Sequence, residues 1–396
     1  MERAGQERVV RAEDVAHMGI TEVLQHAPFI YAQYRRLVAA IQREQPDVAV
    51  LIDFPDVNFR LAKHLRRLGV PVAWFVSPQL WAWKRSRLRW VQQRVDKMLV
   101  IFPFEEQFYR ERGVDAEFVG HPLAAQAHTP LPREVYAAQH GLDPTKTWIA
   151  LLPGSRWKEI HANLPALHEL AMSDLIGSAA AHTTFDGARV HQPADPAAHT
   201  HFEFLLPVAS TIDPSELRAF LSTLNAEHLK YFGPEAATLR LTLVPDAREA
   251  LAQARASVVA SGTATVLAAV VGNPFVVVYR VSTLTFALAK RLVEYPAEFP
   301  ARLDARYDPD GNLPVAMVNL IAGRRVVPEL LQQRFTAANI ASALKPLLSD
   351  GSEREAQIAA LADVRTRLTT AASEDKGPIE RVAEAVLALL AGRGTA

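Results

Sequence analysis

An aspartate that follows a short apolar segment is the first residue of this chain that could do chemistry. Asp53 ends the run from Val48 to Ile52 and precedes Phe54 and Pro55. An apolar run that stops at Asp and Pro is typical of a buried parallel strand, and open α/β sheets bind ligands at the carboxyl ends of their strands. If burial raises its pKa, Asp53 can accept a proton from an attacking hydroxyl group; from position alone, a structural role is equally open.

Two polar residues close behind it, Asp56 and Asn58, stand at the start of a predicted amphipathic helix over 58–68. Asp and Asn are preferred at helix N-caps because their side chains accept hydrogen bonds from free backbone N–H groups. We therefore expect these two residues to cap the helix rather than to react.

Two loops of small residues are candidates for binding an anion. Leu152-Pro-Gly154-Ser155-Arg156 and Ala260-Ser261-Gly262-Thr263-Ala-Thr265 both follow a predicted strand and precede a predicted helix. Small residues let backbone N–H groups approach a phosphate at the positive end of a helix, and an arginine can add a bidentate contact. Neither loop matches the dinucleotide fingerprint or a Walker A loop, so a tight turn without a ligand is the alternative for each.

A third candidate is a cluster of aromatic and basic residues between the second and third predicted strands. Trp residues alternate there with cations, namely Trp81, Trp83, Lys84, Arg85, Arg87, Arg89, Trp90 and Arg94. This composition suits a segment resting on anionic lipid headgroups, or a pocket for an anionic amphiphile. It would also suit single-stranded nucleic acid, and the structural alternative is a helix with Trp in the core and Arg in water.

The elements that must position these residues form two α/β series. Strands and amphipathic helices alternate over 47–123 and again from residue 147, which predicts two doubly wound parallel sheets that face a cleft. We expect an N-terminal domain over 1–123, a linker over 124–146, a C-terminal domain over 147–350 and closing helices over 351–396. Residues 1–46 are mostly polar or helical in pattern, so we expect the N-terminal domain to be incomplete.

Composition excludes several classes of protein. A chain of 396 residues predicts two to three domains. The formal net charge of +0 gives no general attraction to nucleic acid, and the absence of cysteine excludes disulfides and thiolate chemistry and suits the cytoplasm. No segment is apolar enough to span a bilayer or direct secretion. His182, His191, His199 and His201 lie in or beside a predicted surface insertion over 177–200, where solvated histidines are a better interpretation than a metal site.

Taken together, these segments resemble the bacterial lipid-A-disaccharide synthase family, glycosyltransferases of the GT-B fold. The resemblance rests on segments in the family's order: Ile52-Asp-Phe-Pro-Asp-Val-Asn58, Val76-Ser-Pro-Gln-Leu-Trp-Ala-Trp83, Phe102-Pro-Phe-Glu105, Phe118-Val-Gly-His-Pro122, Leu151-Leu-Pro-Gly-Ser-Arg156, Ala260-Ser-Gly-Thr-Ala-Thr265, Val318-Asn-Leu-Ile-Ala-Gly-Arg324 and Val327-Pro-Glu-Leu-Leu-Gln332.

The resemblance implies a reaction and a role for each segment. It implies transfer of 2,3-diacylglucosamine from UDP-2,3-diacylglucosamine to the 6-hydroxyl group of 2,3-diacylglucosamine 1-phosphate, with inversion and release of UDP. Asp53 would be the general base, and the acylated substrates and the inner membrane would meet the segment containing Trp81, Trp83, Lys84, Arg85 and Arg87. UDP would contact residues of the second domain: Gly154, Ser155, Arg156, Ser261, Gly262, Thr263, Asn319 and Arg324. UDP-sugar is a substrate here, and the resemblance implies neither a cofactor nor a metal.

Two departures from the family bear on activity. The family opens with a strand and a Ser-Gly-Glu-Ala-Ser-Gly-Asp loop, so a βαβ-like portion of ~30 residues or more is expected to be missing. Leu267 stands where the family has a glutamate that binds ribose. A UDP-sugar 2-epimerase of the same layout, or an inactive truncated remnant, are the alternatives. Exchange of the C-terminal helices between protomers would give a homodimer.

Overall fold

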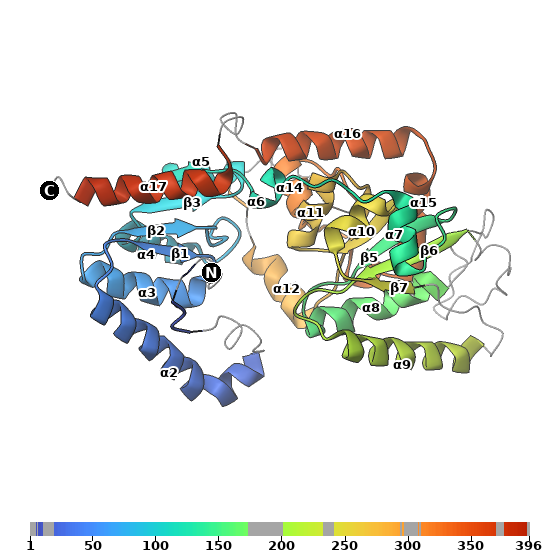
Figure 1. Ribbon diagram of the computed structural model, residues 1–396, viewed down its shortest axis with the longest axis horizontal. Helices are drawn as coiled ribbons and strands as arrows, with labels where there is room; N and C mark the ends of the chain where they lie inside the picture. The colour runs from blue at the N-terminus through green and yellow to red at the C-terminus, as the bar shows by residue number, and fades with distance from the viewer. Residues whose placement is uncertain are drawn as a thin grey trace. The chain divides into compact units, whose positions relative to one another are not determined.

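The computed structural model describes residues 5, 7–10, 20–172, 201–232, 241–293, 295–296, 308, 310–369 and 376–393. The chain forms two compact units (Figure 1). Unit 1 contains Met1–Pro122 together with Thr370–Ala396, and unit 2 contains Leu123–Thr369. The predicted insertion over 177–200, most of the predicted loop over 296–314 and the opening residues lie outside the described parts of the chain.

Unit 1 is built on a parallel four-stranded sheet with the order β1-β2-β3-β4. Its strands are β1 (Ala49–Ile52), β2 (Val72–Phe75), β3 (Lys97–Val100) and β4 (Ala116–Phe118). Its helices are α2 (Ile20–Glu44), α3 (Pro55–Arg67), η2 (Arg85–Arg87), α4 (Leu88–Arg94), α5 (Pro103–Arg110) and α17 (Pro378–Arg393). Every residue of β2 is buried, because helices cover both faces of the sheet at that strand.

β1 is more exposed than its apolar sequence predicts. Leu51 is buried opposite Trp74 of β2, whereas Val50 and Ile52 are 41% and 45% exposed. The strand pairs only with β2 among the described residues. It is therefore an edge strand with one covered face rather than the fully buried strand that we predicted.

Unit 2 contains a parallel six-stranded sheet with the order β10-β9-β8-β5-β6-β7. Its strands are β5 (Thr147–Leu152), β6 (Phe202–Pro207), β7 (Leu241–Val244), β8 (Ala256–Ala260), β9 (Phe275–Tyr279) and β10 (Glu329–Leu331). The helices are α7 (Arg133–His140), α8 (Trp157–Met172), α9 (Pro214–Phe232), α10 (Ala247–Gln253), α11 (Thr263–Val271), α12 (Thr283–Leu292), α14 (Met317–Ala322), α15 (Ala337–Leu348) and α16 (Ser352–Arg367), with the short α6 (Pro122–Ala125) at the junction of the units and η4 (Gln332–Arg334) after β10. Apolar residues of β5, β6 and β8 pack with α8, α9 and α15 into one continuous core.

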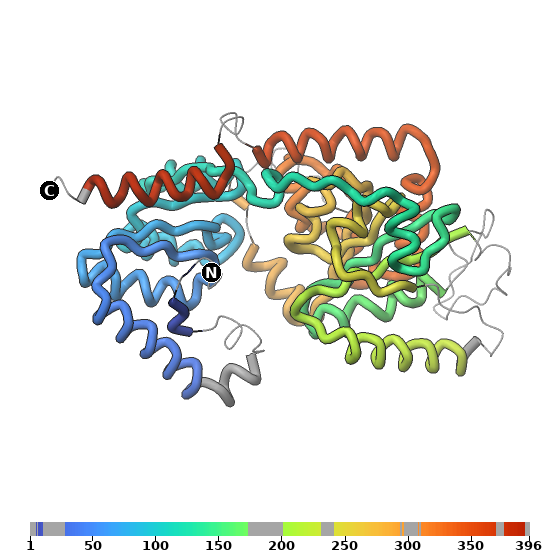
Figure 2. Tube along the Cα trace, viewed as in Figure 1, coloured from blue at the N-terminus to red at the C-terminus, as the bar shows by residue number. Residues whose placement is uncertain are grey.

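The division into units differs from the expected domains at two places. Residues 124–146 belong to unit 2, where the Arg133 guanidinium lies 3.6 Å from the centre of the Trp148 ring and donates to the carbonyl group of Lys146. The predicted closing helices are split between the units: α16 belongs to unit 2, and α17 contacts β2 of unit 1. Figure 2 shows this last helix, in red, beside the blue and cyan trace of unit 1.

Candidate functional site

The turn that carries Asp53 is strained and is held by a neighbouring side chain. Asp53 and Phe54 have φ angles of 45° and 44°, in a region that residues other than glycine rarely occupy. The Asn58 side chain turns back from α3 and donates to the carbonyl groups of Ile52 and Asp53, at 3.1 and 2.6 Å. Strain of this kind persists only where the surrounding structure enforces it, and it gathers at functional sites.

The predicted caps of α3 are wrong. The N-cap residue is Phe54, and it has no side-chain hydrogen bond to the helix. Asn58 is buried and serves the turn before the helix instead, while the Asp56 carboxylate pairs with Arg87 at 2.7 Å. Pro55 at the first helical position removes one of the free N–H groups at the start of the helix, since proline has none.

The Asp53 side chain is exposed rather than buried. The expected burial of this carboxylate beside Phe54 and Pro55 is therefore wrong. Its carboxylate accepts no hydrogen bond from any residue that the structure describes, so both oxygens are open to a ligand. The backbone of Asp53 is nevertheless fixed, because its N–H group donates to the backbone carbonyl group of Phe75 at 2.9 Å.

Trp81 lies in the core of unit 1, so it is not part of a membrane or substrate surface. Its side chain is 2% exposed, and its indole N–H group donates to the buried Glu105 carboxylate at 3.0 Å. The same carboxylate accepts from the Ser77 hydroxyl at 2.8 Å and from the backbone of Phe102 at 3.2 Å. Burial raises the pKa of Glu105 to about 7, against the lowering effect of its hydrogen bonds to Ser77, Trp81 and Phe102.

The rest of the aromatic and basic segment is at the surface. Trp83 is 46% exposed, with the Lys84 ammonium 4.0 Å from the centre of its ring. Arg85 is half-buried and donates to the carbonyl group of Trp81 at 3.3 Å, and Arg87 is held by Asp56. The structural alternative therefore applies to Trp81, while Trp83 and Lys84 form an exposed pair.

In unit 2 the direction of the chain connections reverses between β5 and β8. Chain connections run from β5 outward to β6 and β7, and from β8 in the opposite direction to β9 and β10. β5 and β8 are adjacent and parallel, with Leu152 opposite Val259, so the loops after both strands emerge side by side. Ligands of open α/β sheets bind at such a reversal, outside the carboxyl ends of the strands.

The loop after β5 is organised by Glu159, a residue of the first turn of α8. Its carboxylate accepts from the Ser155 N–H group at 2.8 Å and lies 3.4 Å from the Arg156 guanidinium. Gly154 has a φ of 130°, and a Cβ atom there would lie 2.5 Å from the Cβ of Glu159. The Arg156 side chain is 78% exposed, so its guanidinium is accessible to a phosphate group from solvent.

The loop after β8 opens α11 directly. Gly262 has a φ of 149° and is the N-cap residue, and the Thr265 hydroxyl donates to its carbonyl group at 2.7 Å. Gly262 and Thr263 are exposed, while Ser261 and Leu267 are half-buried. The first N–H groups of a helix have no partner within it, so this end of α11 can receive an anion.

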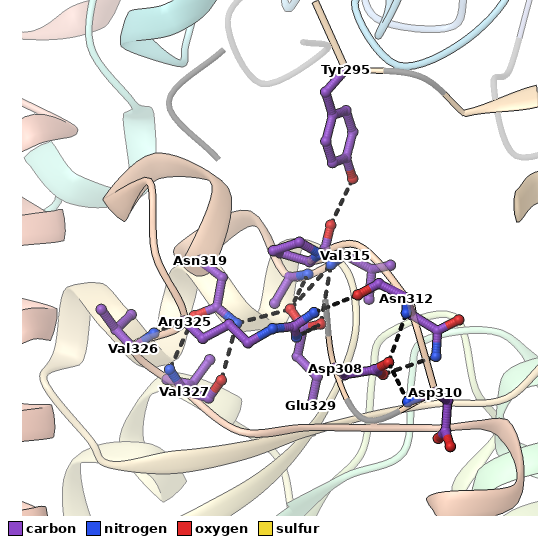
Figure 3. Close-up of polar contacts among 12 residues, drawn as sticks. Tyr295, Asp308, Asp310, Asn312, Val315, Asn319, Arg325, Val326, Val327 and Glu329 are labelled. Atoms are coloured by element: carbon purple, nitrogen blue, oxygen red, sulfur yellow. Dashed lines mark hydrogen bonds and ion pairs between the residues drawn. The ribbon is translucent and has the colours of Figure 1, made fainter. Parts of the chain in front are cut away.

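Asn319 is buried by its own segment and has no polar atom left for UDP. It is 0% exposed, donates to Val327 and Glu329 at 3.0 and 2.8 Å, and accepts from the N–H groups of Val326 and Val327. Figure 3 shows this network, in which Glu329 also pairs with Arg325 at 2.8 Å. The predicted ligand role of Asn319 is therefore wrong. Arg324, by contrast, is exposed.

Two residues that organise the site, Glu105 and Glu159, were not singled out from the sequence, and Asn58 was singled out only as a helix cap. Asn58 and Glu105 lie in segments that carried the family resemblance, but nothing in their spacing tells which backbone groups they bind. The described residues contain no group of three or more His, Asp or Glu side chains placed to hold a metal ion.

The reversal between β5 and β8, flanked by two small-residue loops, defines a doubly wound α/β protein of the kind that binds ligands at this edge of the sheet. The chain belongs to the lipid-A-disaccharide synthetase family, whose sequence model matches residues 1–183 and 215–382. The expected family and enzyme class are thereby confirmed.

Known proteins are similar to this chain over most of its length. The lipid-A-disaccharide synthase of Acidobacterium capsulatum is 47% identical over 390 residues, which cover 98% of this chain and 87% of that protein. The lipid-A-disaccharide synthase of Koribacter versatilis is 45% identical over 389 residues, covering 98% of this chain and 88% of that protein. The solved structure of the calicheamicin glycosyltransferase CalG4 is 18% identical with a TM-score of 0.48, covering 97% of this chain and 82% of that chain.

Proposed function

We propose that this chain transfers 2,3-diacylglucosamine from UDP-2,3-diacylglucosamine to 2,3-diacylglucosamine 1-phosphate, releasing UDP. The family assignment supports this reaction. In this scheme unit 2 binds the nucleotide sugar, and unit 1 supplies the base that activates the acceptor.

The observation that supports the donor site is the position of two small-residue loops after adjacent parallel strands. The diphosphate of UDP would lie at the β5–β8 reversal, against the start of α11 and the exposed guanidinium of Arg156. As the sugar leaves, negative charge develops on the diphosphate. A helix N-terminus and an arginine stabilise that charge without a metal ion, so the scheme needs no cofactor.

Asp53 is the proposed general base. Its carboxylate would take the proton of the acceptor 6-hydroxyl group as that oxygen attacks C1 of the donor sugar. The bond from C1 to the diphosphate oxygen breaks, UDP leaves with the electron pair, and attack from the opposite face inverts the anomeric centre. The turn fixed by Asn58 supports this role, because a base must be held within hydrogen-bond reach of its proton.

The acylated substrates suggest a place of action at the inner membrane. We propose a cytoplasmic enzyme bound peripherally to that membrane, with the exposed pair Trp83 and Lys84 near the lipid surface. Among the described residues, no helix combines the length and apolarity needed to cross a bilayer.

Product analysis tests the proposal. The purified chain is incubated with both substrates in detergent, and the disaccharide 1-phosphate is measured by mass spectrometry. Asp53→Asn should lower kcat at least a hundredfold, whereas the control Asp115→Asn, at an exposed carboxylate of unit 1 that pairs with Lys97, should stay within severalfold of wild type. Full activity of Asp53→Asn would reject the base, and absence of disaccharide from wild type would reject the transfer itself.

A further inference from the structure

Arg and Lys make up half of the residues that line a cleft of about 380 Å³ in unit 1. It lies among α2, α3 and α4, and its walls contain five Arg or Lys side chains, one histidine and one carboxylate. A volume of this size falls within the range of small-ligand pockets. Because the chain as a whole has no net charge, this local excess of positive charge indicates a particular kind of ligand.

Helix α3 supplies three cations to one wall. Arg60, Lys63 and Arg67 are spaced so that they share one face of the helix, and all three line the cleft. None of them makes an ion pair with a residue that the structure describes. Like charges at this spacing repel one another, so an anion bound between them would relieve an unfavourable arrangement.

The other charged residues of the cleft are already engaged. Among the described residues that line it, the one carboxylate is Asp56, which lies in the first turn of α3 and pairs with Arg87 at 2.7 Å. Arg94 donates to the carbonyl group of Phe59 at 3.1 Å, and its guanidinium lies 5.2 Å from the centre of the Trp90 ring. Among the described residues that line the cleft, no carboxylate is therefore left to neutralise the cations of α3, and Phe59 and Trp90 add aromatic rings to the lining.

An exposed aromatic strip leads away from the cleft along α2. Tyr34 lines the cleft, with its ring 6.0 Å from the ring of His64. The ring of Tyr31 lies 6.5 Å from that of Tyr34, and Phe29 and Tyr31 are 44% and 60% exposed. A cationic cleft continuous with exposed aromatic side chains matches a molecule that carries both a phosphate group and an apolar chain.

We propose that this cleft binds the phosphate group of an anionic lipid, with Arg60, Lys63 and Arg67 as its ligands and the α2 strip against the acyl region. The inference rests on the proposed membrane contact and names the chemical group that this contact recognises. The cleft involves neither Asp53 nor the loops of unit 2, so lipid binding and sugar transfer can be tested separately.

Two binding assays on the full chain, without any nucleotide sugar, test the proposal. The first is cosedimentation with vesicles of phosphatidylglycerol and phosphatidylcholine, compared with vesicles of phosphatidylcholine alone. The second is calorimetric titration with glycerol 3-phosphate, which has the phosphate but no acyl chain. The variant is R60Q/K63Q/R67Q, and the charge-matched control is R218Q/K230Q/R365Q, made of exposed cations in unit 2.

Wild type should bind phosphatidylglycerol vesicles, and the α3 variant should lose at least fivefold in bound fraction while the control stays within twofold. Glycerol 3-phosphate should bind wild type weakly, and the α3 variant should not bind it. Equal losses of vesicle binding in both variants would show that binding depends on the general surface charge, and would overturn the proposed site. Binding of glycerol 3-phosphate without binding of vesicles would overturn the lipid as its source. The Asp53→Asn variant, which should lose disaccharide synthesis, should bind vesicles and glycerol 3-phosphate as wild type does.

Discussion

The side-chain amide of Asn58 donates to the backbone carbonyl group of Asp53 at 2.6 Å, across the turn that joins β1 to α3. The same amide reaches the carbonyl group of Ile52 at 3.1 Å, so one side chain closes the end of the strand. This contact explains how two consecutive residues keep φ angles near the left-handed region without a glycine.

Replacement of Asn58 by alanine should therefore affect catalysis more than binding. Two buried hydrogen bonds are lost, which costs about 1–3 kcal/mol of unfolding free energy. The freed turn would misplace the Asp53 carboxylate, so we expect kcat to fall at least tenfold while the affinity for UDP is unchanged. The control is Asn339→Ala, which removes a hydrogen bond to Arg334 in unit 2. An unchanged kcat with a lower melting temperature would show that Asn58 is only structural.

Gly154→Ala tests the donor loop. The new Cβ atom would lie 2.5 Å from the Cβ of Glu159, and the φ of 130° is strained for alanine. The Ser155 and Arg156 positions should shift, and we expect the dissociation constant for UDP, measured by calorimetry, to rise about tenfold, which corresponds to about 1.4 kcal/mol. Gly141→Ala is the control, since Gly141 also has a positive φ but faces open space. Equal effects of both changes would contradict a specific role for the loop.

The buried Glu105 should make unit 1 sensitive to pH. Its pKa is about 7 in the folded protein and 4.5 in the reference state. Between these values the native state holds a proton that the unfolded state has lost, so this group makes stability fall as pH rises. The contribution is at most about 3 kcal/mol, because each pKa unit corresponds to about 1.4 kcal/mol. The unfolding free energy, measured by urea titration, should fall less from pH 5 to pH 7 in Glu105→Gln than in wild type.

His121 should act in the opposite direction over much of the same range. Burial lowers its pKa from 6.5 to about 4, so between these values the unfolded state binds the extra proton and stability rises with pH. The two groups offset each other in wild type. His121→Asn should therefore uncover the Glu105 effect, and its stability should fall more steeply than that of wild type from pH 5 to pH 6.5. Parallel curves for the two proteins would contradict the assigned pKa of His121.

Local sequence signals predict some features of the fold and of the candidate site, but not others. The end of β1 was predictable because an apolar run followed by Asp and Pro is a local signal, and the same holds for the loop before α8. Trp81 and Trp83 could not be told apart, since they stand two residues apart in an irregular segment, and only the distant Glu105 draws one of them into the core. Local spacing cannot show such a partner.

Features that depend on contacts between distant residues could not be predicted from the sequence either. β10 has three residues, too few for a periodic signal, and its place beside β9 depends on the parallel pairing in the folded sheet. Asn319 was assigned to the UDP site only through the family resemblance, yet the backbone N–H groups of Val326 and Val327 bind its side chain. The return of α17 to unit 1 is likewise a tertiary contact that no local pattern of its residues records.

The last prediction concerns the network around Glu329 in unit 2. The side chain of this glutamate is 0% exposed, and its charge is balanced by Arg325 and by the N–H groups of Val315 and Ala316. Removing one partner of a buried ion pair leaves the other charge uncompensated, which costs about 3–5 kcal/mol. Arg325→Met should accordingly lower the unfolding free energy of unit 2 by that amount in denaturant titrations.

A double variant separates the charge from the packing. In E329Q/R325M no charge is left without a partner, and the glutamine can still donate or accept hydrogen bonds, so part of the lost stability should return. Arg324→Met, next in the chain but exposed, is the matched control and should change stability by less than about 0.5 kcal/mol. A double variant no more stable than Arg325→Met would show that the network acts through packing, and that the ion pair of Glu329 and Arg325 contributes little.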